Sequence, residues 1–429
     1  MDTLQLIKNQ LLELIQGIES HSTNQTEIIV LTYHTEKSFE LLAWLKAQQS
    51  YPQFYLNFRD KMQKIVALGK VRTFSSLTAA QNFLQHSNVP LLGGLTFYSQ
   101  AEFFLPRILL TEQANKLTIQ LFVDQANSLS EEICQLLNIL NTFTKTTALE
   151  PINQSIRLLG KKADQQQWCD WVESALVAIR QGILSKVVLA NETLFEAEKN
   201  LNAVDFLAES EHANFGCYHF LFAEDQQKIF VGSTPERLYH RQGQQLHTEA
   251  LAGTALRSED EHFNRSQSDW LLHDEKNTYE NQLVAEGLKQ SLAPYATSIR
   301  LSEPELKPLR LVQHLKRNIF VQLVPDCRDD LCLQTIHPTA AVAGLPKQSA
   351  VEFLQKTENF DRCHYAGTLG IMEKSQAEFC VTIRCAFIEN NKIRVFAGAG
   401  IVEGSIPLLE WQEIERKALG LISLLQEEQ

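Results

Sequence analysis

"ILSKVVLA", residues 183 to 190, has the composition of a β-strand but carries one charged residue, Lys186. On a pleated strand alternate side chains share a face, so Lys186 points the same way as Leu184 and Val188, and both faces are apolar. An ammonium group loses hydration there, which favours the neutral amine unless a partner compensates. For a lone lysine, a side chain that reaches water from a strand end is the alternative interpretation. The role of Lys186 therefore depends on the rest of the chain.

The surrounding sequence mixes short strands with long helices. "HFLFA", "KIFVGS", "EFCVTIRCAFI" and "KIRVFAGAG" predict strands, the last two joined by the hairpin-like "ENNK". Apolar stripes predict helices over 168 to 179, roughly 274 to 290 and 408 to 425. This mixture predicts an α+β protein, a large layered fold of mainly antiparallel β-sheets backed by helices. No repeat or linker divides it, and we expect residues 1–155 to hold little chemistry and residues 156–429 to form the catalytic region.

Composition excludes several classes of function. The 429 residues carry a formal net charge of -12 without a basic block, so we expect neither nucleic acid nor a membrane as partner. No obligate protein partner is evident. The start of the chain predicts an amphipathic helix rather than a signal peptide, and no apolar run approaches membrane-spanning length. The eight cysteines lack C-x-x-C pairs and the twelve histidines lack metal-ligand spacing, which favours a cytoplasmic protein with reduced thiols.

Two predicted helices carry acidic residues beside their apolar stripes. In "EWQEIERKALGLISLL", Glu410, Glu413 and Lys417 are neighbours on the helix surface, and a Glu413–Lys417 pair on a solvated face is the simplest interpretation. In "HDEKNTYENQLVAEGL", Glu280 lies within the packing stripe, where a carboxylate needs a counter-charge, and Asn277 precedes it by one turn. A core arginine is one such partner. Oxygen ligands of this kind also suit Mg²⁺.

Turns and strand ends supply further candidates. Glu236 lies in the turn of "FVGSTPERL", and a turn on a rigid scaffold suits catalysis but is also common. Gly253 and Thr254 in "EALAGTALR" are small enough to let a ligand approach the backbone.

Two C-terminal segments offer sites for an anion. "RVFAGAGIVEGS" lacks the pattern of a nucleotide-binding loop, yet backbone N–H groups near Gly398 and Gly400 are able to bind an anion. Arg384 is the one charge in the apolar "FCVTIRCAF", and an arginine there suits a bidentate contact with a carboxylate.

These motifs together carry a family resemblance. In order from about residue 160 to 425 the chain contains "KVVLA", "GSTPERL", "EALAGTALR", "HPTAAVAGLP", "HYAGTLG", "TIRCA", "FAGAGIVEGS" and "EWQEIERKA". The set resembles the chorismate-utilising enzymes, most closely the menaquinone-specific isochorismate synthases. The resemblance implies an α+β fold of antiparallel sheets, a Mg²⁺ requirement, and the dianion chorismate as substrate. It covers the region after residue 155 far better than the region before it.

The resemblance also implies a metal site. Glu280 and Glu413 resemble the direct Mg²⁺ ligands, and Glu410 and Asn277 resemble residues that bind the metal's waters. The metal would hold the ring carboxylate of chorismate. Gly253 N–H and Lys417 would help.

The second carboxylate of the substrate has its own implied contacts. Tyr365 and Arg384 resemble the residues that bind the enolpyruvyl carboxylate, together with N–H groups of a turn at Gly398 to Gly400. Thr254 is expected beside them in the substrate-binding site. One departure from the family is Asn191, where relatives usually have arginine, and it is expected to alter a local salt bridge only.

Lys186 gains a role from the same resemblance. Isochorismate formation adds water at C2 while the C4 hydroxyl leaves, which requires a base and an acid. Lys186 resembles the base and Glu236 the acid, and burial favours the neutral form of both an amine and a carboxyl group. Relatives that add ammonia usually carry glutamine at the lysine position. Aminodeoxychorismate synthases carry a lysine where this chain has Ala252, so both differences indicate water as the nucleophile.

The predicted activity is therefore an isomerase, an isochorismate synthase. A salicylate synthase, a siderophore-pathway isochorismate synthase and a catalytically inactive chorismate-binding regulator are the alternatives. Ala341 in "HPTAAVAG" lies where salicylate-forming relatives tend to carry threonine, so we expect the reaction to stop at isochorismate. His337 is expected to be a core histidine or a hydrogen-bonding residue of the site.

Overall fold

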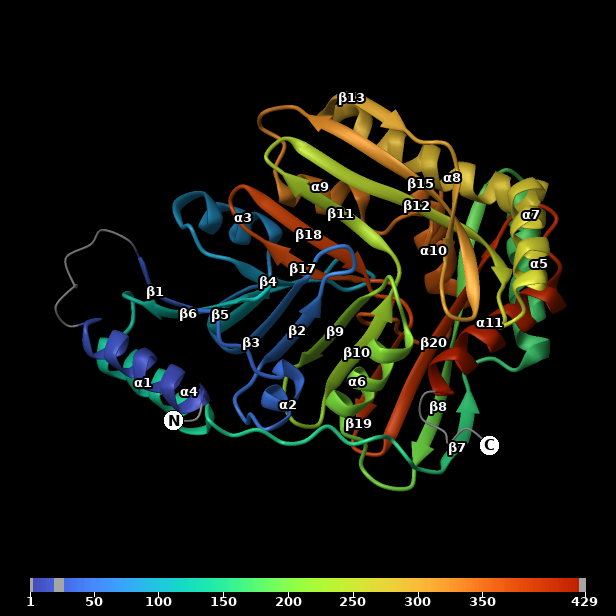
Figure 1. The fold of residues 1–429 in the computed structure, drawn as a ribbon. Helices are drawn as coiled ribbons and strands as arrows, with labels where there is room; N and C mark the ends of the chain where they lie inside the picture. The colour runs from blue at the N-terminus through green and yellow to red at the C-terminus, as the bar shows by residue number, and fades with distance from the viewer. Residues whose placement is uncertain (1–2, 19–26, 424–429) are drawn as a thin grey trace.

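Two arms of antiparallel β-sheet diverge from one long strand, β5 (Ala101–Gln113), in the computed structural model, which describes residues 3–18 and 27–423 (Figure 1). The first arm runs in the order β1 (Ile28–Thr35), β6 (Lys116–Asp124), β5, β3 (Gln63–Phe74), β2 (Gln53–Asn57), β9 (Tyr218–Ala223), β10 (Ile229–Thr234), β19 (Cys385–Glu389), β20 (Lys392–Ile401), β8 (Lys186–Ala197) and β7 (Ile156–Lys161).

The second arm leaves β5 through β4 (Leu91–Leu95). It continues with β17 (Thr368–Met372), β18 (Gln376–Val381), β11 (Arg237–Gln242), β12 (Gln245–Leu256), β15 (Val312–Leu323), and β13 (Ala296–Leu301) and β14 (Glu305–Pro308) side by side along β15. The short β16 (Gly344–Leu345) pairs with β8. All these pairings are antiparallel, which confirms the predicted fold class.

Helices cover the outer faces of the arms (Figure 1). They are α1 (Thr3–Gln16), α2 (Leu41–Lys46), α3 (Leu77–His86), α4 (Leu129–Thr142), α5 (Gln165–Arg180), α6 (Ala203–Ala213), α7 (Glu261–His273), α8 (Glu275–Leu292), α9 (Asp329–Ile336), α10 (Lys347–Thr357) and α11 (Pro407–Ile422). α8 packs on β12 and β15, and α11 packs on β20 and α5. The apolar stripes cause this packing: Ile414, Ala418 and Ile422 of α11 are buried.

The chain crosses between the arms at two adjacent points. β10 and β19 belong to the first arm, whereas β11 and β18 belong to the second, so the chain changes arm at 235–236 and again at 382–384. The crossings are tied together because Val381 N–H donates to Glu236 O at 3.0 Å and Ser233 N–H donates to Arg384 O at 3.1 Å. Glu236 and Arg384 are therefore fixed between the two arms.

One predicted strand is wrong in an informative way. "EFCVTIRCAFI" was expected to be continuous, but it is split into β18 and β19 by the crossing at 382–384. Arg384 has a φ of 52°, a left-handed conformation that ends the strand. The charge in an apolar stretch is thus explained by a break in the strand, which composition does not show.

The other predicted elements are confirmed. The helices appear as α5, α8 and α11, and the "ENNK" hairpin pairs Glu389 with Lys392; residues 424 and 425 of the last helix lie outside the described residues. Leu4, Ile7, Leu11 and Ile15 form the buried face of α1. The division at residue 155 stays a prediction, and it falls between α4 and β7.

Two expectations about the whole chain also have structural outcomes. All eight cysteines are free thiols. Within residues 3–18 and 27–423, no helix is both long and apolar enough to cross a membrane.

Candidate active site

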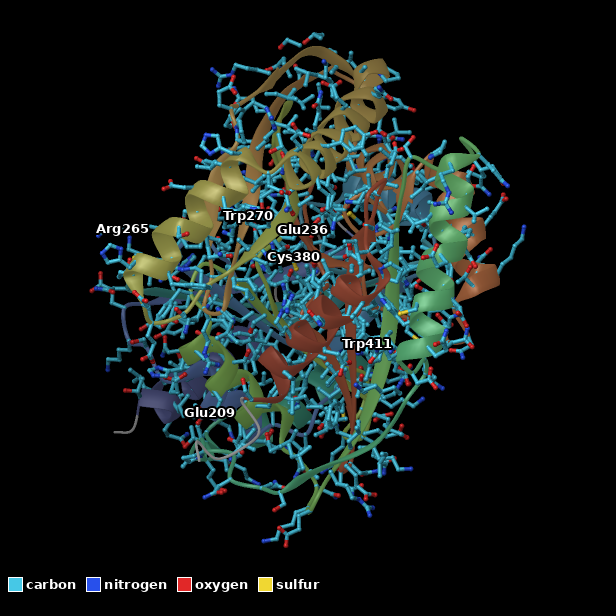
Figure 2. The ribbon with its side chains drawn as sticks, turned by 90° about the vertical axis from the view of Figure 1, so that its right-hand side faces the viewer. Glu209, Glu236, Arg265, Trp270, Cys380 and Trp411 are labelled. Carbon is cyan, nitrogen blue, oxygen red and sulfur yellow. The ribbon has the colours of Figure 1, made fainter. Side chains whose placement is uncertain are left out.

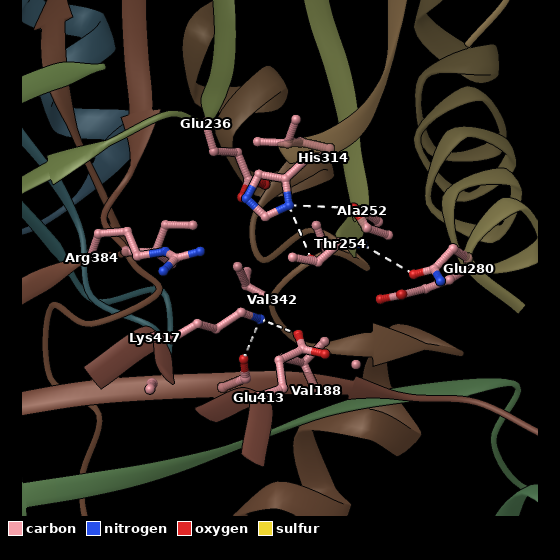
Figure 3. A pocket seen from close by; sticks show the side chains of 18 of the residues that line it. Val188, Glu236, Ala252, Thr254, Glu280, His314, Val342, Arg384, Glu413 and Lys417 are labelled. Carbon is pink, nitrogen blue, oxygen red and sulfur yellow. Dashed lines mark hydrogen bonds and ion pairs between the residues drawn. The ribbon is translucent and has the colours of Figure 1, made fainter. Parts of the chain in front are cut away.

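A pocket lies between the two arms, and the two crossings of the chain form part of its wall (Figure 3). It gathers segments that are far apart in sequence, from β8, β12, α8, β15, β20 and α11. Of the predicted site residues, it is lined by Glu236, Gly253, Thr254, Asn277, Glu280, Ala341, Tyr365, Arg384, Gly398, Gly400, Glu413 and Lys417. Lys186 and Glu410 are not part of the lining.

Lys186 lies directly behind the pocket wall. Its side chain is fully buried, and Nζ is 2.9 Å from Glu280 Oε1. This contact is an ion pair without the angles of a hydrogen bond, because Lys186 Nζ has no hydrogen-bond partner among the described residues. Gly400 makes the approach possible, since a Cβ there would lie 2.1 Å from Glu280 Oε1 and 3.1 Å from Lys186 Cε. Lys186 itself does not line the pocket, but it contacts Glu280, which does.

Glu236 lies near the centre of the molecule and is 3% exposed (Figure 2). Burial raises the pKa of its carboxyl group to about 8, helped by the negative charge of Glu249 and opposed by Lys186 and Arg59. A carboxyl group with this pKa keeps its proton at neutral pH. It is therefore suited to donate a proton.

Each of the three predicted metal carboxylates is paired with a lysine. Besides the Glu280–Lys186 pair, Lys417 Nζ lies 2.5 Å from Glu413 and Lys276 Nζ donates to Glu410 at 2.6 Å.

The pKa values of two of these carboxyl groups are shifted in opposite directions. Burial raises the pKa of Glu413, but Lys417, Lys276 and His314 together lower it by more, so the pKa is lowered. Burial and the charge of Glu413 raise the pKa of Glu410, in spite of Lys276. Glu413 thus stays ionised as a cation ligand must, and Glu410 fits the outer role predicted for it.

The donor set on this side of the pocket fits Mg²⁺, because it consists of carboxylates and an amide oxygen. Glu280, Glu410 and Glu413 each form an ion pair with a lysine and do not converge on a shared position for a metal ion. In the described part of the chain, the one group of three ligand atoms within 4.8 Å of one another is Glu102, Glu224 and His364, outside this pocket. His364 Nε2 there lies 3.2 Å from Glu102. That cluster is not the predicted magnesium site.

A bulge in β12 shapes the wall next to α8. The ladder with β15 shifts between Ala252 and Thr254, and Gly253 has a φ of 82°, which glycine adopts without strain. Thr254 N–H donates to Asn277 Oδ1 at 3.0 Å, so the bulge is tied to the helix that carries Glu280. Asn277 therefore lines the pocket while its Oδ1 accepts a hydrogen bond from the backbone of Thr254.

The opposite side of the pocket carries Arg384, which Figure 3 shows across from Glu280. Burial lowers the pKa of its guanidinium, and Tyr365 and Glu413 oppose this. Tyr365 is buried against Gly398, where a Cβ would lie 2.9 Å from the phenol oxygen.

One predicted feature near these residues is wrong. Gly398 and Gly400 were expected in a turn, but they lie within β20, opposite Ala190 and Val188 of β8. The glycines serve close approach: at these positions a side chain would fill the space of Tyr365 and Glu280. "GAG" next to a strand resembles a loop in sequence because glycine is rare in strands.

Sequence reasoning missed two polar residues of the pocket. His314 Nδ1 and Thr254 Oγ1 form a hydrogen bond of 3.1 Å. Burial lowers the pKa of His314 to about 3, so its imidazole is neutral. It faces Thr254 across the β12–β15 ladder, a pairing that the sequence does not reveal. Lys276, the partner of Glu410, precedes Glu280 by one helical turn, and that spacing was a usable signal.

The remaining candidates have plain structural outcomes. Asn191 accepts from Ala163 N–H at 3.0 Å and donates to Ala163 O at 2.8 Å, so it anchors a loop away from the pocket. His337 is outside the pocket lining, is buried, and contacts Thr96 O at 2.9 Å, which confirms the core interpretation. Ala252 lines the pocket.

The chain is similar to known proteins of one enzyme family. A family model for the chorismate binding enzymes matches residues 95–426, and the chain therefore belongs to the chorismate-binding enzyme family. The chain is 54% identical to isochorismate synthase MenF of Pasteurella multocida, with 100% of both sequences covered. Within its family it belongs to the isochorismate synthases.

Solved structures extend the comparison to the fold. The structure of MenF, the menaquinone-specific isochorismate synthase from Escherichia coli, matches with a TM-score of 0.89 and 37% identity, covering 97% of this chain and 100% of that one. Anthranilate synthase component I from Streptococcus pneumoniae matches with a TM-score of 0.64 at 21% identity and shares the fold. The predicted family and enzyme class are confirmed.

Proposed function

We propose that this protein converts chorismate to isochorismate by adding water at C2 as the C4 hydroxyl leaves, in the pocket between the two arms. The observation that carries the proposal is the pairing of two buried groups. Glu236 has a pKa of about 8 and holds a proton, and Lys186 is fully buried behind the same pocket. An acid and an amine in one water-poor site suit a reaction that gains and loses a hydroxyl.

Charges at two ends of the pocket suit a substrate with two carboxylates. Arg384 and Tyr365 line one side, and we assign them to the enolpyruvyl carboxylate. On the other side, Gly253, Thr254 and Lys417 would face the ring carboxylate. The separation of Arg384 from Glu280 in Figure 3 supports this orientation.

Mg²⁺ is the cation proposed for the ring-carboxylate side. Glu280 and Glu413 would be its direct ligands, with Glu410 and Asn277 holding its waters. When bound, Mg²⁺ would supply the positive charge that fixes the ring carboxylate. Glu280 lies 2.9 Å from Lys186, so Lys186 would lose this ion-pair partner if Glu280 served as a metal ligand, and its amine would then be available as a base.

The proton transfers belong to the chain's own residues. Lys186 accepts a proton from the attacking water, and Glu236 donates its proton to the leaving C4 hydroxyl. The ring double bonds shift from C2 towards C4 as that bond breaks. Burial of Glu236 raises the pKa of its carboxyl group, which keeps the acid protonated.

The pathway and the product are proposed from separate observations. The likeness to the menaquinone-specific enzyme supports a place in menaquinone synthesis, and the free cysteines suit the reducing cytoplasm. Ala341 places a methyl group in the lining, so nothing polar there folds the enolpyruvyl chain for pyruvate loss. We therefore assign isochorismate, rather than salicylate, as the final product.

Product analysis tests the proposal. The protein is incubated with chorismate and Mg²⁺ and the products are separated by chromatography. Isochorismate alone is expected. Salicylate with pyruvate in the absence of an added lyase would instead identify a salicylate synthase, and unchanged chorismate would identify a binding protein.

A further inference from the structure

Arg59, in the turn after β2, reaches from the N-terminal part of the chain to the crossing that carries Glu236. Its guanidinium makes a bidentate contact with Glu249 of β12, at 2.6 Å and 2.9 Å. Both side chains are almost completely buried, with exposures of 2% and 0%. The same guanidinium donates to the carbonyl oxygen of Pro235.

Arg59 and Glu249 contact the residues immediately before and after Glu236 in the sequence. Arg59 holds the carbonyl oxygen of Pro235, and Glu249 Oε1 accepts from Arg237 N–H at 3.1 Å. The neighbouring Asp60 adds a third contact, since Arg237 Nη2 donates to Asp60 Oδ2 at 2.7 Å. The residues on both sides of Glu236 are therefore fixed by the β2–β3 turn and by Glu249.

We propose that Arg59 is a positioning residue for isochorismate formation: together with Glu249 it clamps the crossing at 235–237 and so sets the place and the electrostatic surroundings of Glu236. The inference rests on the proposed role of Glu236 as acid. It also gives the region before residue 155, which we expected to hold little chemistry, a part in the reaction. A bidentate arginine is suited to the task because its planar fork fixes direction as well as charge.

The clamp is also an electrostatic balance. Three charged groups act on the carboxyl group of Glu236: Glu249 from β12 raises its pKa, while Lys186 from β8 and Arg59 lower it. Other ionisable groups lining the pocket are Lys276, Glu280, His314, Tyr365, Arg384, Glu413 and Lys417. Removing the charge of Arg59 should therefore raise the pKa of Glu236, and removing the charge of Glu249 should lower it.

The experiment compares Arg59→Gln with Glu249→Gln in the full-length protein. At saturating Mg²⁺, kcat and kcat/KM for chorismate are measured across the pH range. Because Glu236 must be protonated, its ionisation ends activity at high pH. We expect Arg59→Gln to move that loss to higher pH and Glu249→Gln to move it to lower pH, with kcat reduced between about 10 and 100-fold and KM changed less.

Two further variants separate positioning from folding. Arg59→Lys keeps the charge but loses the fork, so we expect a wild-type position of the alkaline limb with reduced kcat. Arg72→Gln is the matched control, since Arg72 of β3 makes a similar bidentate pair with Asp124, at 2.5 Å and 2.8 Å, outside the pocket lining. It should lower thermal stability without moving the pH profile.

The outcomes that overturn the inference are distinct from failure of the proposed function. If wild-type protein makes isochorismate and both glutamine variants keep its pH profile and kcat, or shift the profile in the same direction, Arg59 is structural only. If Arg59→Gln and Glu249→Gln do not fold, an Arg59→Lys variant with wild-type kcat overturns the inference. Absence of isochorismate from the wild-type protein would instead refute the proposed function.

Discussion

Glu413 and Glu236 both line the pocket, but their surroundings shift the pKa values of their carboxyl groups in opposite directions. Glu413 lies 2.5 Å from Lys417, which lowers its pKa, whereas burial and Glu249 raise the pKa of Glu236 to about 8. No ion pair of Glu236 occurs in the part of the chain that the structure describes. A direct ion pair keeps Glu413 ready to hold a metal, whereas burial outweighs the more distant charges of Lys186 and Arg59 and keeps Glu236 ready to give a proton.

The largest effect is expected on the cation side. Loss of a residue that only orients a metal ligand usually lowers activity by roughly 10 to 100-fold. Glu280→Ala and Glu413→Ala each remove a proposed direct ligand, so each should lower kcat/KM by more than that. The rate is measured against Mg²⁺ concentration, and circular dichroism checks the fold. Glu286→Gln, on the exposed side of α8, is the control. Near-normal activity of either alanine variant at limiting Mg²⁺ would remove that residue from the metal site.

Lys186→Gln tests the base. An amide does not take a proton from water, so we expect a loss of about 10² to 10⁴-fold in kcat, the usual contribution of a positioned base. Binding of chorismate with Mg²⁺, measured by calorimetry, should persist, because Lys186 lies behind the pocket lining. Undiminished isochorismate formation by this variant would end the assignment of Lys186 as base.

The acid side predicts a pH dependence with a definite sign. Since the pKa of Glu236 is about 8 and the reaction needs the protonated form, kcat/KM should fall as pH rises through that value. Glu236→Gln should be slow at every pH and should lack this limb. A wild-type profile that stays flat through the same range would show that the proton comes from another group.

Ala341→Thr should give the smallest effect. Ala341 lines the pocket, and a hydroxyl group there offers a contact that holds the enolpyruvyl chain in the geometry that loses pyruvate. We expect a small amount of salicylate and a modest loss of rate. Val342→Thr, which adds a hydroxyl at the next lining residue, is the control for specificity. If Ala341→Thr is only slower and forms no salicylate, Ala341 merely packs.

Most of the site residues proposed from the sequence line one pocket, but their arrangement in it was not predictable from the sequence. Lys186 and Glu280 stand out locally because each is a charge in an apolar stretch, and Glu236 stands out because it lies in a turn at the end of a strand. Glu413 was found only by its helical spacing from Glu410 and Lys417. The family resemblance then supplied roles that local patterns leave open.

What the sequence did not show depends on distant pairing. The break that frees Arg384 arises because β18 and β19 join different arms, and Arg59 meets Glu249 across 190 residues of chain. The pair of Glu280 with Lys186 and the pair of Glu410 with Lys276 likewise join different elements, so neither pairing is visible in the local sequence. The pair of Glu413 with Lys417 differs, because it lies within α11 at a spacing of four residues and was predicted from that spacing.

The source of the new hydroxyl group tests the central claim most directly. The reaction is run in ¹⁸O-labelled water, and the isochorismate formed in the first turnovers is analysed by mass spectrometry with fragment assignment. Addition of an activated water predicts one heavy oxygen, located at C2, and release of the original C4 oxygen into solvent. Isochorismate that carries no label would mean that the C4 hydroxyl moves within the molecule, and would contradict the assignment of Lys186 and Glu236.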